Sequence, residues 1–388
     1  MSKYSLGEFI KQIRGVSYKP ADVTNSENGT PILRANNIQD DGLVFDDLVY
    51  IVDKKVGQEQ LLQKGDIVIC ASSGSKNLVG KAATFNEFES SVSFGAFCKV
   101  VRVKNIADIE SDYIRFYFHS KYYREQISAN SSGSNINNIK TEDIDGLTIN
   151  IPSISEQKEA VFLFERYFSA ISAKKKELSA LDELVKSRFI EMFGELDLSA
   201  QKSNWERLSE LGTIYTGTTP STSDESNWDG NILWITPAEM NEESFFISDT
   251  VRKITEKGAK SKSLTQMPIG TVLLSTRAPI GKVGIVAKPM TCNQGFKNFY
   301  CPDKLNSIYL YVLLKYNTHY LNSIGTGTTF KEISKTTCGN IRIPVPAMDK
   351  QNEFADFVKL IDKSKFIVQQ QIKDLEELLD SKMDEYFR

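Results

Sequence analysis

Hydrophobic positions follow two different spacings along this chain. Short apolar runs bounded by turn residues predict β-strands, and the clearest are LVYIVD at 48–53, GDIVICA at 65–71, FCKVVRV at 97–103, GTVLLST at 270–276 and KVGIVA at 282–287. Two longer stretches, 113–127 and 309–324, have the spacing of a helix. The pattern predicts two globular parts of mixed α/β character, at residues 1–152 and 195–346.

Each globular part is followed by a long stretch of helical periodicity. Pro152 and Pro346 end the preceding strands, and Ser155 and Asp349 are candidate N-caps. Long helices are therefore expected at residues 153–194 and 347–388. The first helix carries the chain from one globular part to the other, so the second must run back beside it.

Apolar residues in these stretches recur at spacings of three and four, which is typical of a coiled coil. The expected seam consists of Phe164, Phe168, Ile171, Leu178, Leu181 and Val185 on the first helix and Ile361, Val368, Ile372, Leu375 and Leu379 on the second. The predicted fold is thus two α/β domains separated by two long helices that form an antiparallel coiled coil. Packing of each helix onto its own globular part is the alternative.

The sequence also repeats itself. GSNINNIKTEDIDGLTINIPSISEQ at 133–157 aligns without a gap with GTTFKEISKTTCGNIRIPVPAMDKQ at 327–351, an offset of 194 that matches Gly133 with Gly327 and Phe193 with Phe387. The segments between the strands match at other offsets. An internal duplication gives two copies of one site related by a pseudo-two-fold axis, which suits a target that also comes in pairs.

Composition narrows the class of protein. The 388 residues are 40% hydrophobic and 25% charged, which is ordinary for a soluble globular protein. No membrane-spanning run or signal peptide is apparent, so a cytoplasmic protein is expected. The five scattered cysteines predict reduced thiols and no metal site. The net charge of −3 weakens the case for a simple electrostatic DNA binder.

Catalytic motifs are missing from the sequence. It has no NPPY-type loop or Gly-rich methyl-donor site, no G-x-S-x-G and no phosphate-binding loop. His119 and His319 are interpreted as ordinary helix residues, and the aromatic residues between 113 and 123 as core residues. We therefore expect neither enzymatic activity nor a cofactor.

Two globular units, each closed by a G[ST]…I…IP.P…[EK]Q segment that leads into a long helix, resemble the specificity subunit of type I restriction–modification systems. The strongest match is GTVLLSTRAPIGKVGIVAKPMTCNQGF at 270–296. The first repeat is looser, with GDIVICASSGSKNLVGKAATF at 65–85 and SFGAF at 93–97 where the second has CNQGF. The resemblance covers essentially the whole chain.

The resemblance implies a non-catalytic subunit that reads a bipartite DNA target. Each globular part would be a target-recognition domain, and the helices would fix the gap between the half-sites. Two methyltransferase subunits, and in the nuclease form also translocase–endonuclease subunits, would bind to it. A protein-interaction scaffold that does not itself read DNA is the alternative.

Basic, amide and hydroxyl side chains in two places of the first repeat and three places of the second are the candidate DNA contacts, since these groups bind phosphates and base edges. In the first repeat they are Ser72, Ser73, Lys76, Asn77, Lys81, Asn135, Asn137 and Lys140. In the second repeat they are Ser275, Thr276, Arg277, Lys282, Asn293, Gln294, Lys297, Thr328, Thr329 and Lys331. A tight hairpin with solvated charges, or a hydrogen-bonded turn, explains the same residue types.

Overall fold

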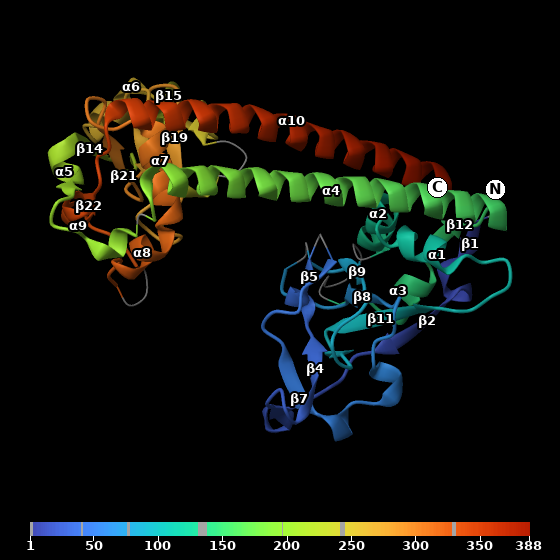
Figure 1. Cartoon of the computed structure of the whole chain (residues 1–388). Helices are drawn as coiled ribbons and strands as arrows, with labels where there is room; N and C mark the ends of the chain where they lie inside the picture. The colour runs from blue at the N-terminus through green and yellow to red at the C-terminus, as the bar shows by residue number, and fades with distance from the viewer. Residues whose placement is uncertain are drawn as a thin grey trace. The chain divides into compact units, whose positions relative to one another are not determined.

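The computed structural model describes residues 3–39, 42–75, 78–130, 138–195, 197–240, 245–327 and 331–388. The chain forms two compact units (Figure 1). Unit 1 contains Met1–Lys175 and Gln371–Arg388, and unit 2 contains Lys176–Gln370. Each unit therefore combines one globular part with pieces of both long helices.

The globular part of unit 1 is built on two main sheets, with the strand orders β2-β11-β8-β9 and β10-β4-β7-β3. Two small sheets, β1-β12 and β5-β6, complete it. The strands are β1 (Lys3–Ser5), β2 (Ile10–Arg14), β3 (Val23–Thr24), β4 (Gly29–Leu33), β5 (Ile38–Gln39), β6 (Gly42–Leu43), β7 (Val49–Val52), β8 (Ile67–Cys70), β9 (Ala82–Thr84), β10 (Ser93–Phe94), β11 (Cys98–Val103) and β12 (Thr148–Asn150).

Unit 2 repeats this plan in its globular part, with the orders β14-β21-β18-β19-β16 and β17-β15-β20 and the small sheet β13-β22. The strands are β13 (Glu206–Arg207), β14 (Thr213–Thr216), β15 (Trp228–Ile235), β16 (Phe246–Ile247), β17 (Arg252–Ile254), β18 (Val272–Leu274), β19 (Val283–Val286), β20 (Met290–Cys292), β21 (Lys297–Tyr300) and β22 (Arg342–Ile343). The five strands predicted from apolar runs are confirmed as β7, β8, β11, β18 and β19.

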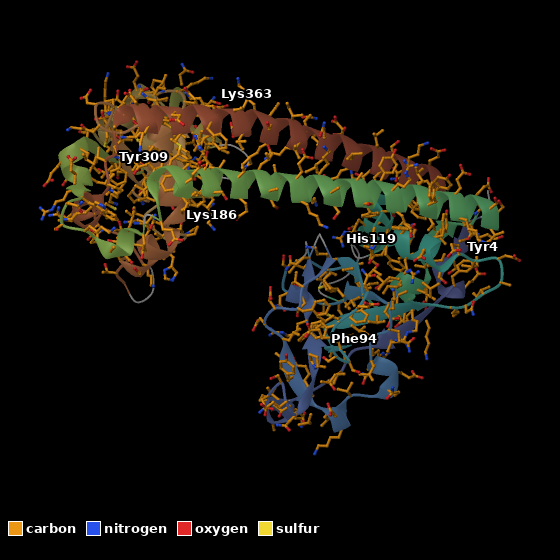
Figure 2. The ribbon with its side chains drawn as sticks, in the orientation of Figure 1. Tyr4, Phe94, His119, Lys186, Tyr309 and Lys363 are labelled. Carbon is orange, nitrogen blue, oxygen red and sulfur yellow. The ribbon has the colours of Figure 1, made fainter. Side chains whose placement is uncertain are left out.

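The short helices correct one expectation. Each predicted single helix is divided in two: α1 (Ser111–Tyr117) and α2 (Lys121–Asn130) replace 113–127, and α7 (Ser307–Tyr316) and α8 (Thr318–Ser323) replace 309–324. Polar side chains account for both breaks. The Ser120 hydroxyl donates to the Tyr117 carbonyl and accepts the Tyr123 N–H, while Asn317 Oδ1 accepts the Leu198 N–H. His119 lies in the first break and not in a helix (Figure 2).

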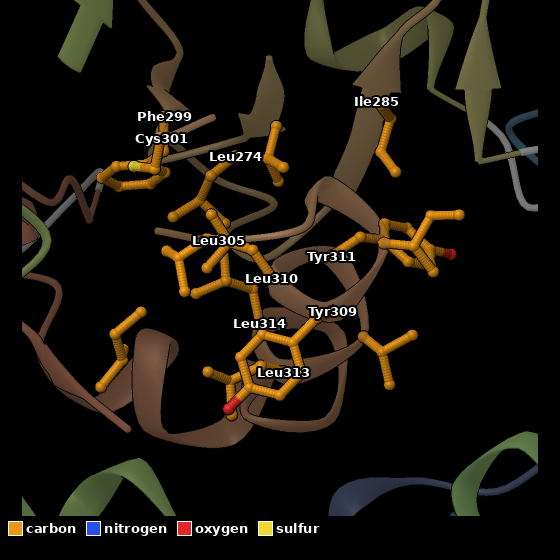
Figure 3. Close-up of a cluster of buried hydrophobic side chains, with 14 of the residues drawn as sticks. Leu274, Ile285, Phe299, Cys301, Leu305, Tyr309, Leu310, Tyr311, Leu313 and Leu314 are labelled. Atoms are coloured by element: carbon orange, nitrogen blue, oxygen red, sulfur yellow. The ribbon is translucent and has the colours of Figure 1, made fainter. Parts of the chain in front are cut away.

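The remaining short helices are α3 (Thr141–Asp145) in unit 1 and α5 (Leu208–Leu211), α6 (Glu256–Ser261) and α9 (Lys335–Asn340) in unit 2. The aromatic side chains of the first helical stretch are core residues as predicted, because Tyr113, Tyr117 and Tyr123 are fully buried. Their counterpart in unit 2 is α7, whose side chains from Ile308 to Leu314 pack on β18, β19 and β21 (Figure 3).

The two long helices are α4 (Ile154–Phe193) and α10 (Met348–Phe387). The predicted N-caps are wrong, because α4 begins at Ile154 and α10 at Met348, so that Ser155 and Asp349 lie inside the helices. At the start of α4, Ser153 and Glu156 form a reciprocal capping box: the Ser153 N–H donates to Glu156 Oε2 at 2.9 Å, and Ser153 Oγ accepts the Glu156 N–H. At the start of α10, Asp349 lies within the first turn.

Within each unit the long helices pair in antiparallel fashion. In unit 1 the start of α4 packs on the end of α10, where Phe164 contacts Phe387 at a ring-centroid distance of 5.7 Å. In unit 2 the end of α4 packs on the start of α10, where Phe189 and Phe354 are 5.4 Å apart and Arg188 pairs with Glu353 at 2.7 Å. The opposite chain directions confirm the antiparallel arrangement.

The expected seam residues are partly relocated. The hydrophobic core of unit 1 contains Phe164, Ile171 and Leu379, and Ile372 and Leu375 pack against it while partly exposed. The core of unit 2 contains Val185 and Ile361, and the partly exposed Leu181 packs against it. Val368 is buried and Leu178 is half-buried. Phe168 departs from the prediction: its ring is stacked 5.5 Å from Phe116 of α1, on the globular part. The long helices therefore pack on each other and on the globular parts.

The duplicated glutamines explain why the repeat extends to the helix starts. Gln157 is fully buried; its Oε1 accepts the Glu110 N–H, and its Nε2 donates to the carbonyls of Asp108 and Pro152. Gln351 repeats all three bonds with the Asn306 N–H and the carbonyls of Lys304 and Pro346. Each glutamine thus fixes the start of a long helix to the loop before α1 or α7.

Candidate nucleic-acid interface

Three loops meet at one end of the main sheet of unit 1. The Ala71 and Ser72 N–H groups, which follow β8, donate to the carbonyl of Phe97, just before β11, at 2.9 and 3.0 Å. The Ile139 N–H of the duplicated segment donates to the Ala71 carbonyl at 2.8 Å, and Ser72 pairs with Asn138. The two places predicted separately in the first repeat are therefore adjacent in the fold, and the turn before β11 lies beside them.

The same three loops meet in unit 2. The Thr276 N–H donates to the Gly295 carbonyl at 2.7 Å, and the Ile333 N–H donates to the Thr276 carbonyl at 2.9 Å. Arg277 pairs with Glu332 as Ser72 does with Asn138. Two equivalent sites thus share one backbone frame and carry different side chains.

Glycines of matching role close the loops that follow β8 and β18. The Gly80 N–H donates to the Cys70 carbonyl, and the Gly281 N–H donates to the Ser275 carbonyl. Their φ angles are +79° and +96°, a region that side chains with a Cβ rarely adopt. The carbonyls of the next residues, Lys81 and Lys282, accept the N–H groups of Cys70 and Ser275, so the chain returns to the preceding strand in both units.

The strand register corrects the alignment of SFGAF with CNQGF. Cys98 pairs with Cys70 on β8, and its counterpart Phe296 pairs with Ser275 after β18. Phe97 therefore corresponds to Gly295 and not to Phe296, and Gly95 corresponds to Asn293. The sequence alignment is wrong by one residue because it matched identical residue types, whereas backbone pairing between strands determines which positions are equivalent.

Arg277 is an exposed predicted contact in the loop that follows β18. Its side chain is 46% exposed, and its Nε lies 3.0 Å from Glu332 Oε2. The other carboxylate oxygen of Glu332 lies 3.4 Å from Lys297 Nζ. Glu332 thus offsets charge at the loop tip, which leaves a modest positive field for phosphates.

Five predicted contacts in unit 2 are engaged inside the protein. Ser275 and Thr276 are fully buried and bond to the carbonyls of Pro279 and Gly295, and Lys297 is 9% exposed in its side chain. Lys282 Nζ donates to the carbonyls of Pro237 and Met240, and Asn293 Oδ1 accepts the Gly295 N–H. These five side chains support the loops, and their direct contact with DNA stays a prediction. Gln294 and Lys331 are exposed, and Gln294 Oε1 accepts a hydrogen bond from Thr219.

In unit 1 none of the described predicted contacts is fully buried. Ser72, Ser73 and Lys81 are half-buried, and Lys140 is exposed. Six predicted contacts lie outside the described residues: Lys76, Asn77, Asn135, Asn137, Thr328 and Thr329.

A recess of about 750 Å³ lies beside these loops in unit 1. Its wall includes Tyr18, Arg34, Gly95 and Phe97 together with the predicted Ser72 and Ser73. Arg34 Nη2 donates to Asp47 at 2.7 Å, and Arg34 Nε is buried without a hydrogen-bond partner among the described residues. Sequence reasoning missed Arg34, which stands in no duplicated motif, and Phe97, which ends the segment SFGAF but has an apolar side chain.

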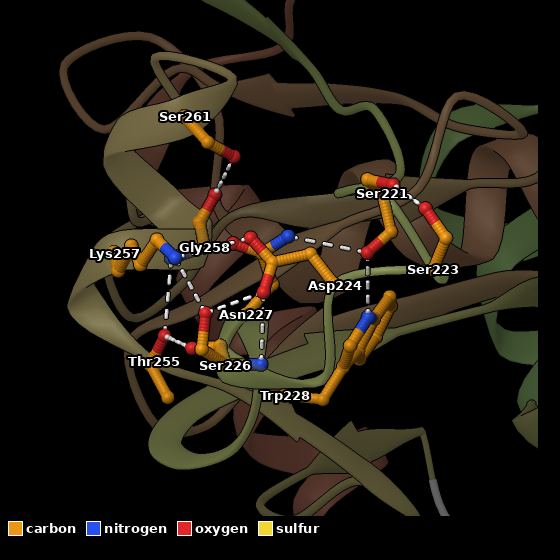
Figure 4. A network of polar contacts seen from close by, with 10 residues as sticks. All are labelled: Ser221, Ser223, Asp224, Ser226, Asn227, Trp228, Thr255, Lys257, Gly258 and Ser261. Atoms are coloured by element: carbon orange, nitrogen blue, oxygen red, sulfur yellow. Dashed lines mark hydrogen bonds and ion pairs between the residues drawn. The ribbon is translucent and has the colours of Figure 1, made fainter.

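Sequence reasoning also passed over the basic segment RKITEKGAKSK at 252–262. The structure pairs three of its lysines with acids: Lys253 with Asp249, Lys257 with Asp224 and Lys260 with Glu256. Figure 4 shows how Lys257 joins Asp224 and Ser226 in one polar network. These acidic partners reduce the positive charge that the amino-acid sequence of the segment suggests.

The described residues offer little for metal or thiol chemistry. They contain no cluster of three or more His, Cys, Asp or Glu suited to a metal ion. The five cysteines are buried and unpaired, and burial raises the pKa of Cys98 and Cys292 to about 12. Such thiols stay protonated at neutral pH and are poor nucleophiles. Over the described residues, no helix is long and apolar enough to cross a membrane.

Comparison with known proteins also finds two copies of one domain in this chain. The family model for the type I restriction modification DNA specificity domain matches residues 1–183 and 202–377. The chain belongs to this family and carries two copies of its domain.

Several curated relatives are specificity subunits of type I restriction enzymes. The MjaIX subunit of Methanocaldococcus jannaschii is 40% identical over 184 residues, which are 46% of this chain and 43% of that protein. The EcoKI subunit of Escherichia coli K12 is 37% identical over 176 residues, 45% of this chain and 37% of that protein. The match thus spans less than half the length of these relatives. The MjaVIII subunit is 21% identical over 387 residues, 92% of this chain and 85% of that protein.

Solved structures share the fold. A chain from a study of complex assembly and conformational transition of the type I R-M system aligns with a TM-score of 0.56 at 17% identity, covering 100% of this chain and 97% of that one. The type I S subunit from M. genitalium aligns with a TM-score of 0.53 at 13% identity, covering 100% and 96%. Two α/β specificity domains joined through long paired helices are therefore the fold of this chain.

Proposed function

We propose that this protein is the non-catalytic DNA-recognition subunit of a cytoplasmic type I restriction–modification complex and reads a bipartite, asymmetric target. The observation that carries the proposal is the pair of equivalent three-loop sites, one in each specificity domain. They share backbone hydrogen bonds but differ in side chains, as two readers of different half-sites require. Residues 1–152 and 195–346 would be the recognition domains.

The chemistry of each site fits duplex DNA. The exposed guanidinium of Arg277 matches the N7 and O6 acceptors of guanine or a phosphate. Ser72, Ser73 and Lys140 supply hydroxyl and ammonium donors suited to phosphates and base edges in the other domain. Because Glu332 offsets part of the charge, a partner with its own basic surface would supply additional attraction to DNA.

The paired helices, residues 153–194 and 347–388, would carry the methyltransferase subunits, and endonuclease subunits where these exist. Exposed apolar side chains on α10 support this role: Leu360, Phe366 and Ile367 are 63%, 68% and 57% exposed. A contiguous exposed apolar patch marks an interaction site, and Leu360 and Phe366–Ile367 lie about two helical turns apart on α10. Phe366→Arg should therefore reduce copurification with the methyltransferase without changing the fold.

The test of the function is methylation in cells. The chain is coexpressed with the adenine methyltransferase from the same operon, and modified adenines are mapped across the genome. A bipartite motif that disappears when this chain is omitted supports the proposal. A complex that forms without any sequence-dependent methylation or DNA binding favours the scaffold alternative.

The half-site assignment needs a separate variant. Arg277→Ala should weaken binding to one half-site by about 1–3 kcal/mol if the guanidinium touches a base. Lys304→Ala is the matched control, because it removes one exposed cation beyond the far end of β21. Equal effects of the two substitutions would contradict a contact through Arg277.

A further inference from the structure

Phe97 is exposed at the point where the three loops of unit 1 meet. Its side chain is 70% exposed, although the neighbouring Phe94 and Cys98 are almost completely buried. The equivalent position in unit 2 is Gly295, which has no side chain. The first domain has therefore added a large apolar group at a place where the second has none.

The backbone beneath Phe97 is held firmly. Its carbonyl accepts the N–H groups of Ala71 and Ser72, and the preceding Ala96 N–H donates to the Val16 carbonyl at 3.0 Å. The Gly95 N–H donates to the Leu33 carbonyl, and the Cys98 N–H to the Gly95 carbonyl. The aromatic ring is thus presented on a hydrogen-bonded turn, although its exposure forgoes the stabilisation that burial of an apolar ring would give.

The recess beside the ring in unit 1 is lined by residues that differ from their counterparts in unit 2. Gly95 forms part of its wall, and its counterpart in unit 2 is Asn293, whose side chain is bonded to Gly295. Ala96 also lies on the wall, and its counterpart Gln294 is bonded to Thr219. Small residues form the wall next to Phe97, and Arg34, whose Nη2 donates to Asp47, also lines the recess.

We propose that Phe97 contacts the methyl group of a thymine in the half-site read by the first domain, with the edge of that base pair entering the recess beside Arg34. This inference rests on the proposed function. Among the groups that base pairs present in the major groove, the thymine methyl is the apolar one. An apolar ring flanked by the Ser72 and Ser73 hydroxyls and one guanidinium matches such an edge.

The readout is the thymine methyl itself. The complete complex of this chain with its methyltransferase is titrated with fluorescent duplexes that carry the mapped target. At each thymine of each half-site in turn, dT is replaced by dU, which lacks only the methyl group. One replacement, in one half-site, should weaken binding about fourfold, the effect of burying one methyl-sized group.

Two variants complete the cycle. Phe97→Ala should bind the dT and dU duplexes equally while the other half-site keeps its discrimination. Ala96→Gln introduces at this exposed wall position the side chain of its unit 2 counterpart, Gln294. The longer side chain should narrow the recess and weaken binding of the same half-site. Val23→Ala, an exposed apolar residue on β3, is the control and should keep the dT preference.

The outcomes separate this inference from the proposed function. If the wild-type complex discriminates target from random DNA but no dT-to-dU change weakens binding, the thymine contact is wrong. The contact is also wrong if Phe97→Ala keeps the fourfold preference, or if Ala96→Gln leaves that half-site unaffected. A wild-type complex that neither binds nor methylates any sequence would instead overturn the recognition function itself.

Discussion

At the scale of single residues, the two sites show how one backbone supports two chemistries. Arg277 and Glu332 in unit 2 stand where Ser72 and Asn138 stand in unit 1. The hydrogen bonds that position these pairs come from main-chain groups, which are the same whatever side chain they carry. Side chains at the loop tips are therefore free to differ between domains while the frame stays fixed.

Glu332 is predicted to limit DNA affinity. Glu332→Gln removes the negative charge next to Arg277 while keeping an acceptor for Lys297, so affinity for duplex DNA should rise about threefold to tenfold. Fluorescence anisotropy across a salt series measures this effect. Glu256→Gln on α6 removes an exposed acid elsewhere and should leave affinity unchanged. An unchanged affinity for Glu332→Gln would mean that Arg277 is remote from the DNA.

The buried glutamines are predicted to be structural. Gln157→Ala leaves one buried N–H and two carbonyls without partners, which should cost about 3 kcal/mol of stability in unit 1. Gln351→Ala should have the same effect on unit 2. Urea unfolding measures both, with the exposed Gln371→Ala as a control expected within about 0.5 kcal/mol of wild type. A loss near that of the control would show that the bonds contribute little.

At the scale of elements, each unit depends on the end of a helix that begins in the other unit. Phe387, the last residue of α10, lies 5.0 Å from Tyr113, and Phe193, the last residue of α4, lies 5.0 Å from Tyr309. Phe193 and Phe387, which are 194 positions apart in the sequence, therefore make equivalent contacts in the two units. A helix with one apolar stripe has to bury it, and these contacts bury both ends of both helices.

Phe387→Ala is predicted to destabilise unit 1 although it lies more than 200 positions from most of that unit's residues. Loss of a buried phenylalanine costs about 3–5 kcal/mol. Hydrogen exchange should become faster in α1 and in the start of α4, while α7 in unit 2 keeps its protection. Phe366→Ala, which removes an exposed ring from the same helix, is the control. Uniform protection in both variants would contradict the exchange of helix ends.

At the scale of the whole molecule, helix length is predicted to set the distance between half-sites. A helix of 40 residues is roughly 60 Å long, and one heptad contributes about 10 Å, close to three base pairs. Removing seven residues from both α4 and α10 should shorten the gap in the methylated motif by about three base pairs. Removal from one helix alone should disrupt the pairing and abolish methylation. An unchanged gap after the double deletion would contradict the spacer role.

The sequence by itself determined the duplication, the strand positions, the two long helices and their antiparallel sense. These features follow from hydrophobic periodicity and chain connectivity, which can be read directly from the amino-acid sequence. The sequence also marked the loop with Arg277, because the segment 270–296 resembles the motif of the type I specificity subunit family.

Only the tertiary structure decided which of the marked residues are accessible. Ser275, Thr276 and Lys297 have suitable chemistry but are buried, and Lys282 is bonded to main-chain carbonyls. The structure also decided the register that matches Phe97 with Gly295, and it placed Arg34 beside them. Burial and register depend on contacts between segments far apart in the chain, since backbone pairing across strands fixes which side chain faces solvent.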